Sequence, residues 1–323
     1  MTKSPAFGPA IFRADAIAPE THAFNEKLRR ASLNAPARTE IPLTLERELP
    51  PGGGLLPRVN PRQDAEIRQI PGPASALPIR ILRPEHGRVK GLYVHFHGGG
   101  FCLGAAAHHD DHLTSLADHA EVVTVSVDYR LAPEHPYPAG PADAEAAAWW
   151  AITKGTMEFG VDKVVLGGES AGATLAAMAA LRLRNRRGYR GLAGLNLSQG
   201  VYDFSMTPSL RRAIDTLVIN RDVVKQHLQR FIGKLGSEEA TRPELSVLYA
   251  DLEGMPPALF TIGTLDALLD DTLFLYMRWL AAGAEARLDI YPGGVHGFPG
   301  TATQLGSQAR SQVEQFVAQR CNG

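Results

Sequence analysis

Cysteine is almost absent from this chain of 323 residues, which has only Cys102 and Cys321. Two cysteines cannot form a disulfide framework, so we expect both to be reduced and the protein to be cytoplasmic. The net charge is only −1 at pH 7, from 33 Lys and Arg against 34 Asp and Glu. A nucleic-acid-binding protein usually carries a strongly basic face, so the sequence predicts no nucleic-acid partner.

Long hydrophobic runs are also missing. The first residues contain no apolar run of the length that a secretory signal peptide needs. No stretch of about 18 consecutive apolar residues occurs, so we predict no membrane span. The composition, 44% hydrophobic and 21% charged, is close to globular averages, which excludes wholesale disorder and fibrous repeats. The length fits two ordinary domains or one large α/β domain with an insertion.

From about residue 65 the sequence alternates between β-prone runs and helical segments. Strands are expected at about 65–69, 77–82, 91–96, 121–128, 163–166, 192–197, 258–262 and 287–291. Helices are expected at about 110–118, 142–159, 171–187, 270–282 and 301–320. This alternation predicts a mostly parallel sheet that helices cover on both faces.

Two helical segments stand apart from the alternation. Residues 19–34 favour an amphipathic helix in which Phe24 and Leu28 share one face. Residues 204–247 are polar and helical, with their best helix at 221–235. A helical insertion in such a sheet usually covers the site. We therefore predict a cap formed by residues 1–45 and 203–250, and a core formed by residues 46–202 and 251–323.

The central chemical signal is the sequence GESAG at residues 168–172, a match to G-x-S-x-G. A β-prone run precedes it and a helix follows, which is the setting of a nucleophile elbow. The tight turn forces Ser170 into a strained backbone conformation, so Gly168 and Gly172 are needed as small neighbours. A glycine-rich turn with a capping serine is the alternative interpretation.

A serine hydroxyl needs a base at neutral pH, and the base needs a third group to orient it. In α/β-hydrolases the order along the chain is serine, acid, histidine. Only His227 and His296 follow Ser170. His227 falls within a helix of the insertion, where we expect a surface residue. His296 lies in a glycine-rich loop after the last strand, and we predict it as the base.

Asp266 ends the strand that begins near residue 258, and it is the predicted acid. Asp270 and Asp271 are alternatives, although both suit the first turn of the next helix better. Glycines 98–100 follow another strand directly, and their backbone N–H groups can face a ligand without interference from a Cβ atom. This run predicts a loop that binds an oxyanion, with a flexible surface turn as the alternative.

Together these motifs resemble the bacterial hormone-sensitive-lipase-like (family IV) esterases of the α/β-hydrolase superfamily. The matching stretches are, in chain order, 97–101 (HGGGF), 128–139 (DYRLAPEHPYPA), 168–172 (GESAG), 263–268 (GTLDAL) and 296–298 (HGF). The resemblance implies an α/β-hydrolase fold with a mostly parallel eight-stranded sheet and a helical cap. It also implies a serine carboxylesterase that acts on a small ester, uses no cofactor and often forms a homodimer.

The resemblance assigns roles to individual residues. It implies a catalytic triad of Ser170 as nucleophile, His296 as base and Asp266 as the acid that orients the base. It also implies an oxyanion hole formed by the backbone N–H groups of Gly99, Gly100 and Ala171. It also implies that Arg130 and Glu134 hold the loop beneath the oxyanion hole. Glu169 stands where the family usually has Asp or Thr, and Ala267 stands where it usually has Pro.

The family mostly favours short- to medium-chain acyl esters, because the cap closes the acyl pocket. Candidate pocket walls are the aromatic residues Phe24, Tyr202, Phe204, Phe231 and Phe298, although aromatic side chains are more often core. An amidase, lactonase or deacetylase could use the same triad. A ligand receptor is a further alternative, because the plant gibberellin receptor resembles this family. That receptor lacks the triad histidine, whereas His296 is present here.

Two further features are predicted to be structural. His108 and His112 are four residues apart, a spacing that could bind a metal on a helix. Without a third ligand in a known pattern, and with Asp110 suited to begin a helix, we predict a polar helix start and no metal. Cys102, beside the glycine loop, is predicted to be a small packing residue.

Overall fold

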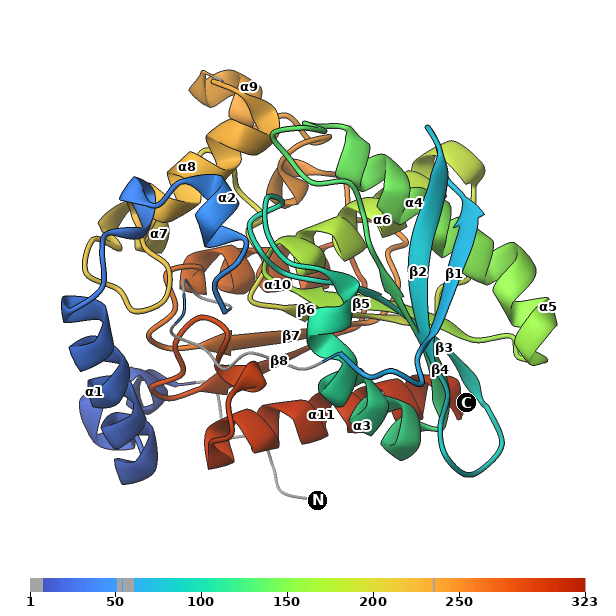
Figure 1. Ribbon diagram of the computed structural model, residues 1–323, viewed down its shortest axis with the longest axis horizontal. Coiled ribbons are helices and arrows are strands. Elements are labelled where there is room, and N and C mark those ends of the chain that lie inside the picture. The colour runs from blue at the N-terminus through green and yellow to red at the C-terminus, as the bar shows by residue number, and fades with distance from the viewer. Residues whose placement is uncertain (1–7, 51–53, 55–60, 235, 323) are drawn as a thin grey trace.

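An eight-stranded sheet crosses the molecule, in the order β1-β2-β4-β3-β5-β6-β7-β8 (Figure 1). The computed structural model describes residues 8–50, 54, 61–234 and 236–322. Residues 1–7 lie outside the described residues. Two predictions concern them, namely that they are part of the cap and that they contain no signal peptide. β2 is antiparallel to both β1 and β4, and all the other neighbouring strands are parallel. The predicted mostly parallel sheet is confirmed.

The strands and helices follow the predicted alternation. The strands are β1 (Glu66–Pro71), β2 (Ala76–Leu82), β3 (Gly91–Phe96), β4 (Val122–Val127), β5 (Val164–Glu169), β6 (Gly194–Ser198), β7 (Ala258–Gly263) and β8 (Ala286–Tyr291). The helices beside the sheet are α3 (Asp110–Ala120), α4 (Ala139–Trp150), α5 (Thr156–Phe159), α6 (Ala171–Arg187), α10 (Leu269–Ala281) and α11 (Gln304–Cys321). The predicted helix at 142–159 is α4 and α5 joined by a wider helical turn.

The helices form a layer on each face of the sheet. In Figure 1, α3 and α11 lie below the sheet, whereas α4, α6 and α10 lie above it. Side chains alternate along a strand, so each central strand contributes to both layers. In β3, Leu92, Val94 and Phe96 belong to the main apolar core, and Tyr93 packs with α3 and α11. Burial of these residues on both sides fixes the sheet as a rigid platform for the loops at its edge.

The remaining helices gather over one end of the sheet (Figure 1). They are α1 (Pro19–Leu33), α2 (Leu43–Glu46), α7 (Pro208–Arg212), α8 (Arg221–Ile232) and α9 (Ser237–Ala240). The N-terminal segment and the insertion contact each other directly, because Gln226 of α8 donates a hydrogen bond to the carbonyl oxygen of Thr39. Among the residues that the structure describes, no helix combines the length and the apolar character that crossing a membrane requires.

Candidate active site

Ser170 occupies a sharp turn between β5 and α6. Its φ of +55° and ψ of −124° are a strained conformation for a residue with a side chain. A Cβ atom at Gly168 or at Gly172 would overlap the carbonyl oxygen of Phe96 on the neighbouring strand. The glycines on either side of Ser170 are therefore required by the turn, as the sequence predicted for a nucleophile elbow.

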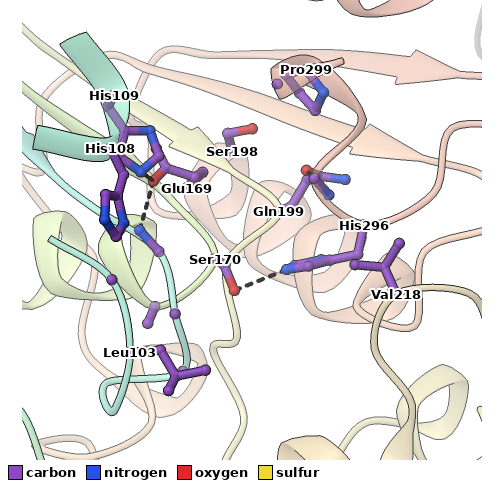
Figure 2. Close-up of a pocket in the computed structure, with 18 of the residues that line it drawn as sticks. Leu103, His108, His109, Glu169, Ser170, Ser198, Gln199, Val218, His296 and Pro299 are labelled. Atoms are coloured by element: carbon purple, nitrogen blue, oxygen red, sulfur yellow. Dashed lines mark hydrogen bonds and ion pairs between the residues drawn. The ribbon is translucent and has the colours of Figure 1, made fainter. Parts of the chain in front are cut away.

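A chain of hydrogen bonds joins Ser170 to His296 and Asp266, and Figure 2 shows the contact between Ser170 and His296. His296 Nε2 lies 2.9 Å from Ser170 Oγ, and His296 Nδ1 lies 2.9 Å and 3.1 Å from the two carboxylate oxygens of Asp266. The three residues follow β5, β7 and β8, whose carboxyl ends meet at the same edge of the sheet. In this arrangement the imidazole can accept the serine proton while the carboxylate holds the ring in place.

Asp270 and Asp271, the two alternative acids, accept hydrogen bonds from residues other than His296. Asp271 is fully buried and accepts hydrogen bonds from the N–H groups of Tyr202 and Asp203, at 2.7 Å and 3.0 Å. Asp270 accepts a hydrogen bond from Ser209 N–H. Both carboxylates therefore fix the start of the insertion, whereas Asp266 faces the histidine.

Gln199 is a site residue that the sequence analysis missed. Its amide nitrogen donates to Asp266 Oδ2 at 2.6 Å and to the carbonyl oxygen of Val295 at 3.1 Å. Its amide oxygen accepts from Gly297 N–H at 3.0 Å. Gln199 thus connects the acid to both sides of the His296 loop. Its place directly after β6, at the sheet edge of the other site residues, was the only signal available in the sequence.

The glycine loop after β3 has the backbone that an oxyanion site needs. Gly99 and Gly100 have φ values of +119° and +59°, in the left-handed region that favours glycine. A Cβ atom at Gly99 would overlap the Leu103 carbonyl, and one at Gly100 would overlap the His227 ring. The N–H groups of Gly99, Gly100 and Ala171 donate to no other described residue. They are therefore free to donate to a bound oxygen atom.

Glu169 and the segment after β4 support this loop from two sides. Glu169 Oε1 accepts a hydrogen bond from Gly98 N–H at 2.6 Å. On the other side, Tyr129 donates its hydroxyl hydrogen to the His97 carbonyl at 2.7 Å. Arg47 pairs with Glu134 and also donates to the Cys102 carbonyl. The loop is therefore held at both of its ends.

Arg130 and Cys102 stabilise the structure around the site through an ion pair and through packing. Arg130 forms an ion pair at 2.8 Å with Asp143 of α4, which fixes the segment after β4 against that helix. Cys102 is fully buried, and burial raises the pKa of its thiol to about 12. A thiol in this state is a poor nucleophile, so its role is packing.

His227 is not a surface residue, and that prediction is wrong. Its side chain is buried because α8 lies across the glycine loop and turns this face of the helix inward. His227 Nε2 lies 3.7 Å from Glu46 Oε1, and Arg38 forms an ion pair with the same oxygen at 2.8 Å. Burial raises the pKa of Glu46, but His227 and Arg38 bring it down to about 2. This charged cluster fastens α2 to α8 above the site.

A cavity of about 550 Å³ opens at Ser170 and His296. Its wall toward the insertion is mostly apolar and includes Val218, Ile219, Val224 and Leu228, with His227 as a polar member. Its walls toward α3 and α11 are polar and include Tyr93, His95, His109, Glu169, Asn196 and Arg310. Figure 2 shows His109 and Glu169 on the side of Ser170 opposite His296. The volume is within the range of small-molecule sites.

The five predicted aromatic wall residues are not among those that line this cavity. The Phe231 ring stacks on Phe101 with ring centroids 4.0 Å apart, and Phe204 meets both rings edge-on. Phe24 and Phe298 pack in a separate apolar cluster, and Tyr202 belongs to the main core. The prediction that they form the pocket walls is wrong, because these rings pack against other side chains in the interior.

Comparisons with known proteins agree with this fold. Residues 93–300 match the family model described as the alpha/beta hydrolase fold. The carboxylic ester hydrolase LipN of Mycobacterium tuberculosis is 33% identical over 263 residues, which are 79% of this chain and 69% of that protein. The carboxylesterase NlhH of the same organism is 32% identical over 247 residues, which are 75% of this chain and 77% of that protein.

A solved structure gives the same result. The hyperthermophilic esterase from the archaeon Pyrobaculum calidifontis superposes with a TM-score of 0.82 at 28% identity, covering 94% of this chain and 98% of that one. The relatives found by sequence and the solved structure are therefore both esterases, and each matches most of the length of this chain. The chain belongs to the hormone-sensitive-lipase-like (family IV) esterases of the α/β-hydrolase superfamily, and it is a carboxylic ester hydrolase.

Proposed function

We propose that this ester hydrolase is a serine carboxylesterase for short- to medium-chain acyl esters, with Ser170, His296 and Asp266 as its catalytic triad. The observation that carries the proposal is the hydrogen-bond chain from Ser170 Oγ through His296 to Asp266, with both contacts at 2.9 Å. The strained elbow presents the serine hydroxyl to the cavity. The N–H groups of Gly99, Gly100 and Ala171, which donate to no other described residue, belong to the glycine loop and the start of α6.

The mechanism follows from these positions. His296 accepts the Ser170 proton as Oγ attacks the ester carbonyl, and Asp266 stabilises the imidazolium that forms. The oxyanion accepts hydrogen bonds from the N–H groups of Gly99, Gly100 and Ala171, which are already oriented before the reaction. His296 then donates its proton to the leaving alcohol. Water, activated by the same imidazole, hydrolyses the acyl-enzyme.

The preference for short to medium acyl chains rests on the apolar side of the cavity. Val218, Ile219, Val224 and Leu228 come from the insertion and close this side near Ser170. We assign the described residues of the predicted cap segments, 1–45 and 203–250, to a cap that encloses the acyl chain. A cytoplasmic location and a homodimer stay predictions from the sequence.

Hydrolysis of p-nitrophenyl esters from acetate to palmitate tests the proposal, with Ser170→Ala as the matched variant. We expect the highest kcat/KM with short or medium chains, and a loss of roughly four to six orders of magnitude in Ser170→Ala. Activity that survives in Ser170→Ala would contradict the assignment of the nucleophile.

Activity that increases steadily up to palmitate would contradict the closed acyl pocket and leave the triad intact. A parallel assay on p-nitroanilides of the same acyl chains separates an esterase from an amidase. We expect the esters to be cleaved far faster. Equal rates on both would assign the triad to amide hydrolysis instead.

A further inference from the structure

A second cluster of reactive side chains lies beside Ser170, on the face of the sheet toward α3 and α11. His95 of β3, Glu169 of β5 and His109, just before α3, each offer one ligand atom, and these atoms lie within 4.8 Å of one another. His95 Nε2 is 3.0 Å from Glu169 Oε2, and His109 Nε2 is 3.2 Å from Glu169 Oε1. His109 and Glu169 are close together in Figure 2.

These separations match the coordination geometry of zinc. With bonds of about 2.0 to 2.2 Å, the ligand atoms of a tetrahedral Zn²⁺ site lie roughly 3.3 Å apart. The two nitrogen–oxygen distances are close to that value, but they reach different oxygens of the carboxylate, 3.0 Å to Oε2 from His95 and 3.2 Å to Oε1 from His109. A zinc ion bound to one of these oxygens therefore requires one of the imidazoles to move toward it. Two imidazoles and one carboxylate are also a donor set that borderline divalent ions prefer.

The charge of the cluster favours a cation. In the described part of the chain, neither Lys nor Arg lies within ion-pair distance of the Glu169 carboxylate, whose ion-pair contacts are the two histidines.

Ser126 orients His95 in the way that a metal ligand needs. His95 Nδ1 lies 2.9 Å from Ser126 Oγ, and this hydroxyl lies 3.4 Å from the Ala106 carbonyl oxygen. When Ser126 donates its hydrogen to that carbonyl, it accepts one from His95 Nδ1–H. The lone pair of His95 Nε2 then faces Glu169. A partner of this kind on the second ring nitrogen is typical of metal-binding histidines.

An ion can reach the cluster, because His95, His109 and Glu169 all line the 550 Å³ cavity. His112 lines the same wall, and its Nδ1 is buried without a hydrogen-bond partner among the described residues. We propose that His95, His109 and Glu169 bind Zn²⁺, with the fourth coordination position open toward the cavity. The sequence predicted no metal, and the pair that it offered for consideration was His108 and His112, because helical spacing does not reveal residues on neighbouring strands.

Equilibrium dialysis of the full chain against Zn²⁺ alone, followed by metal analysis, tests this proposal independently of the esterase reaction. We expect one Zn²⁺ per chain for the wild type. His109→Gln should weaken binding by about tenfold or more. The matched control is His86→Gln, because His86 is an exposed histidine that lies 3.8 Å from Glu85. This control should bind zinc as the wild type does.

Visible absorption of the Co²⁺-substituted wild type provides a second measurement that needs no variant. Four-coordinate Co²⁺ absorbs intensely in the visible region, and six-coordinate Co²⁺ absorbs weakly. Intense bands that Zn²⁺ displaces would support the site. The proposal is overturned if the wild type binds no zinc, if His109→Gln binds as tightly as the wild type, or if Co²⁺ shows only weak bands.

Discussion

The two faces of the central sheet differ sharply in chemistry, although the same strands form both. Toward α4, α6 and α10, the side chains are apolar and include Leu92, Val94, Phe96, Val123, Val125, Leu166, Leu195, Leu197 and Phe260. Toward α3 and α11, the strands carry the polar residues His95, Thr124, Ser126, Glu169, Asn196, Ser198 and Thr261, all of them buried except Glu169, which is partly exposed. Only the amino-terminal halves of this second face pack as an apolar cluster.

This difference separates stability from function within one sheet. The apolar face contributes burial of hydrophobic surface and nothing that can react. The polar face connects to the site through Glu169, which precedes Ser170 and holds Gly98 of the glycine loop. Substitutions on the apolar face should therefore change the free energy of unfolding and leave kcat unchanged, whereas a substitution on the polar face at Glu169 should change kcat.

Phe260→Ala should have the largest effect on stability, because Phe260 is fully buried on the apolar face and packs edge-on against Trp279. We expect a loss of about 4 kcal/mol in the free energy of unfolding, measured by urea denaturation. Well below the unfolding transition, kcat should stay close to that of the wild type. Phe274→Ala, at a ring that is 42% exposed on α10, is the control and should cost about 0.5 kcal/mol or less. A large fall in kcat for Phe260→Ala would contradict the expectation that the apolar face contributes to stability alone.

Glu169→Ala should show the opposite pattern on the polar face. The substitution removes the acceptor for Gly98 N–H, so the glycine loop loses one of its supports. We expect kcat to fall about a hundredfold, with KM changed little, because the oxyanion stabilisation that we propose for this loop acts mainly on the transition state. Glu169→Gln should restore most of kcat, because its amide oxygen can accept the same hydrogen bond. A change in KM alone, or no rescue by Gln, would contradict this positioning role.

The sheet and the reactive loops could be predicted because their signals are local in the sequence. Alternation of strands and helices defined the parallel sheet, and α6 begins and ends at the predicted residues, 171 and 187. The positions of Ser170, Asp266 and His296 followed from glycine turns and strand ends. Each of these features depends on neighbours within a few residues, so periodicity and turn chemistry were sufficient.

Features that depend on packing between distant segments could not be predicted. His227 was expected on the surface because the hydrophilic face of α8 gives no sign that α2 and the glycine loop cover it. The aromatic residues were assigned to the pocket, but their rings meet one another in the interior. The positions of Gln199 and of the cluster of His95, His109 and Glu169 depend on the register in which β3, β5 and β6 pair. This register cannot be predicted from any local sequence pattern.

Tyr93→Phe tests whether the polar face is held by paired hydrogen bonds. The Tyr93 hydroxyl accepts a hydrogen bond from Asn196 Nδ2 at 2.9 Å, and both side chains are buried. The substitution leaves that amide hydrogen unpaired, so we expect a loss of about 2 kcal/mol in the free energy of unfolding. In the double variant with Asn196→Leu, part of this loss should be recovered, because no buried donor is left unpaired. Additive losses in the double variant would contradict the pairing.

Thr124→Val should have the smallest effect and the opposite sign, although Thr124 lies on the same polar face. Its hydroxyl is buried and has no hydrogen-bond partner among the described residues, whereas Ser126, two residues along β4, lies within hydrogen-bond distance of His95. Valine has nearly the same shape and removes the cost of a buried, unpaired hydroxyl, so we expect a gain of up to about 1 kcal/mol in thermal or urea unfolding. Ser126→Ala is the matched control and should lose stability instead. If Thr124→Val also lowers the free energy of unfolding, the Thr124 hydroxyl must bind a water molecule inside the sheet layer. The hydrogen-bonded part of the polar face would then extend beyond Glu169 and His95, away from Ser170.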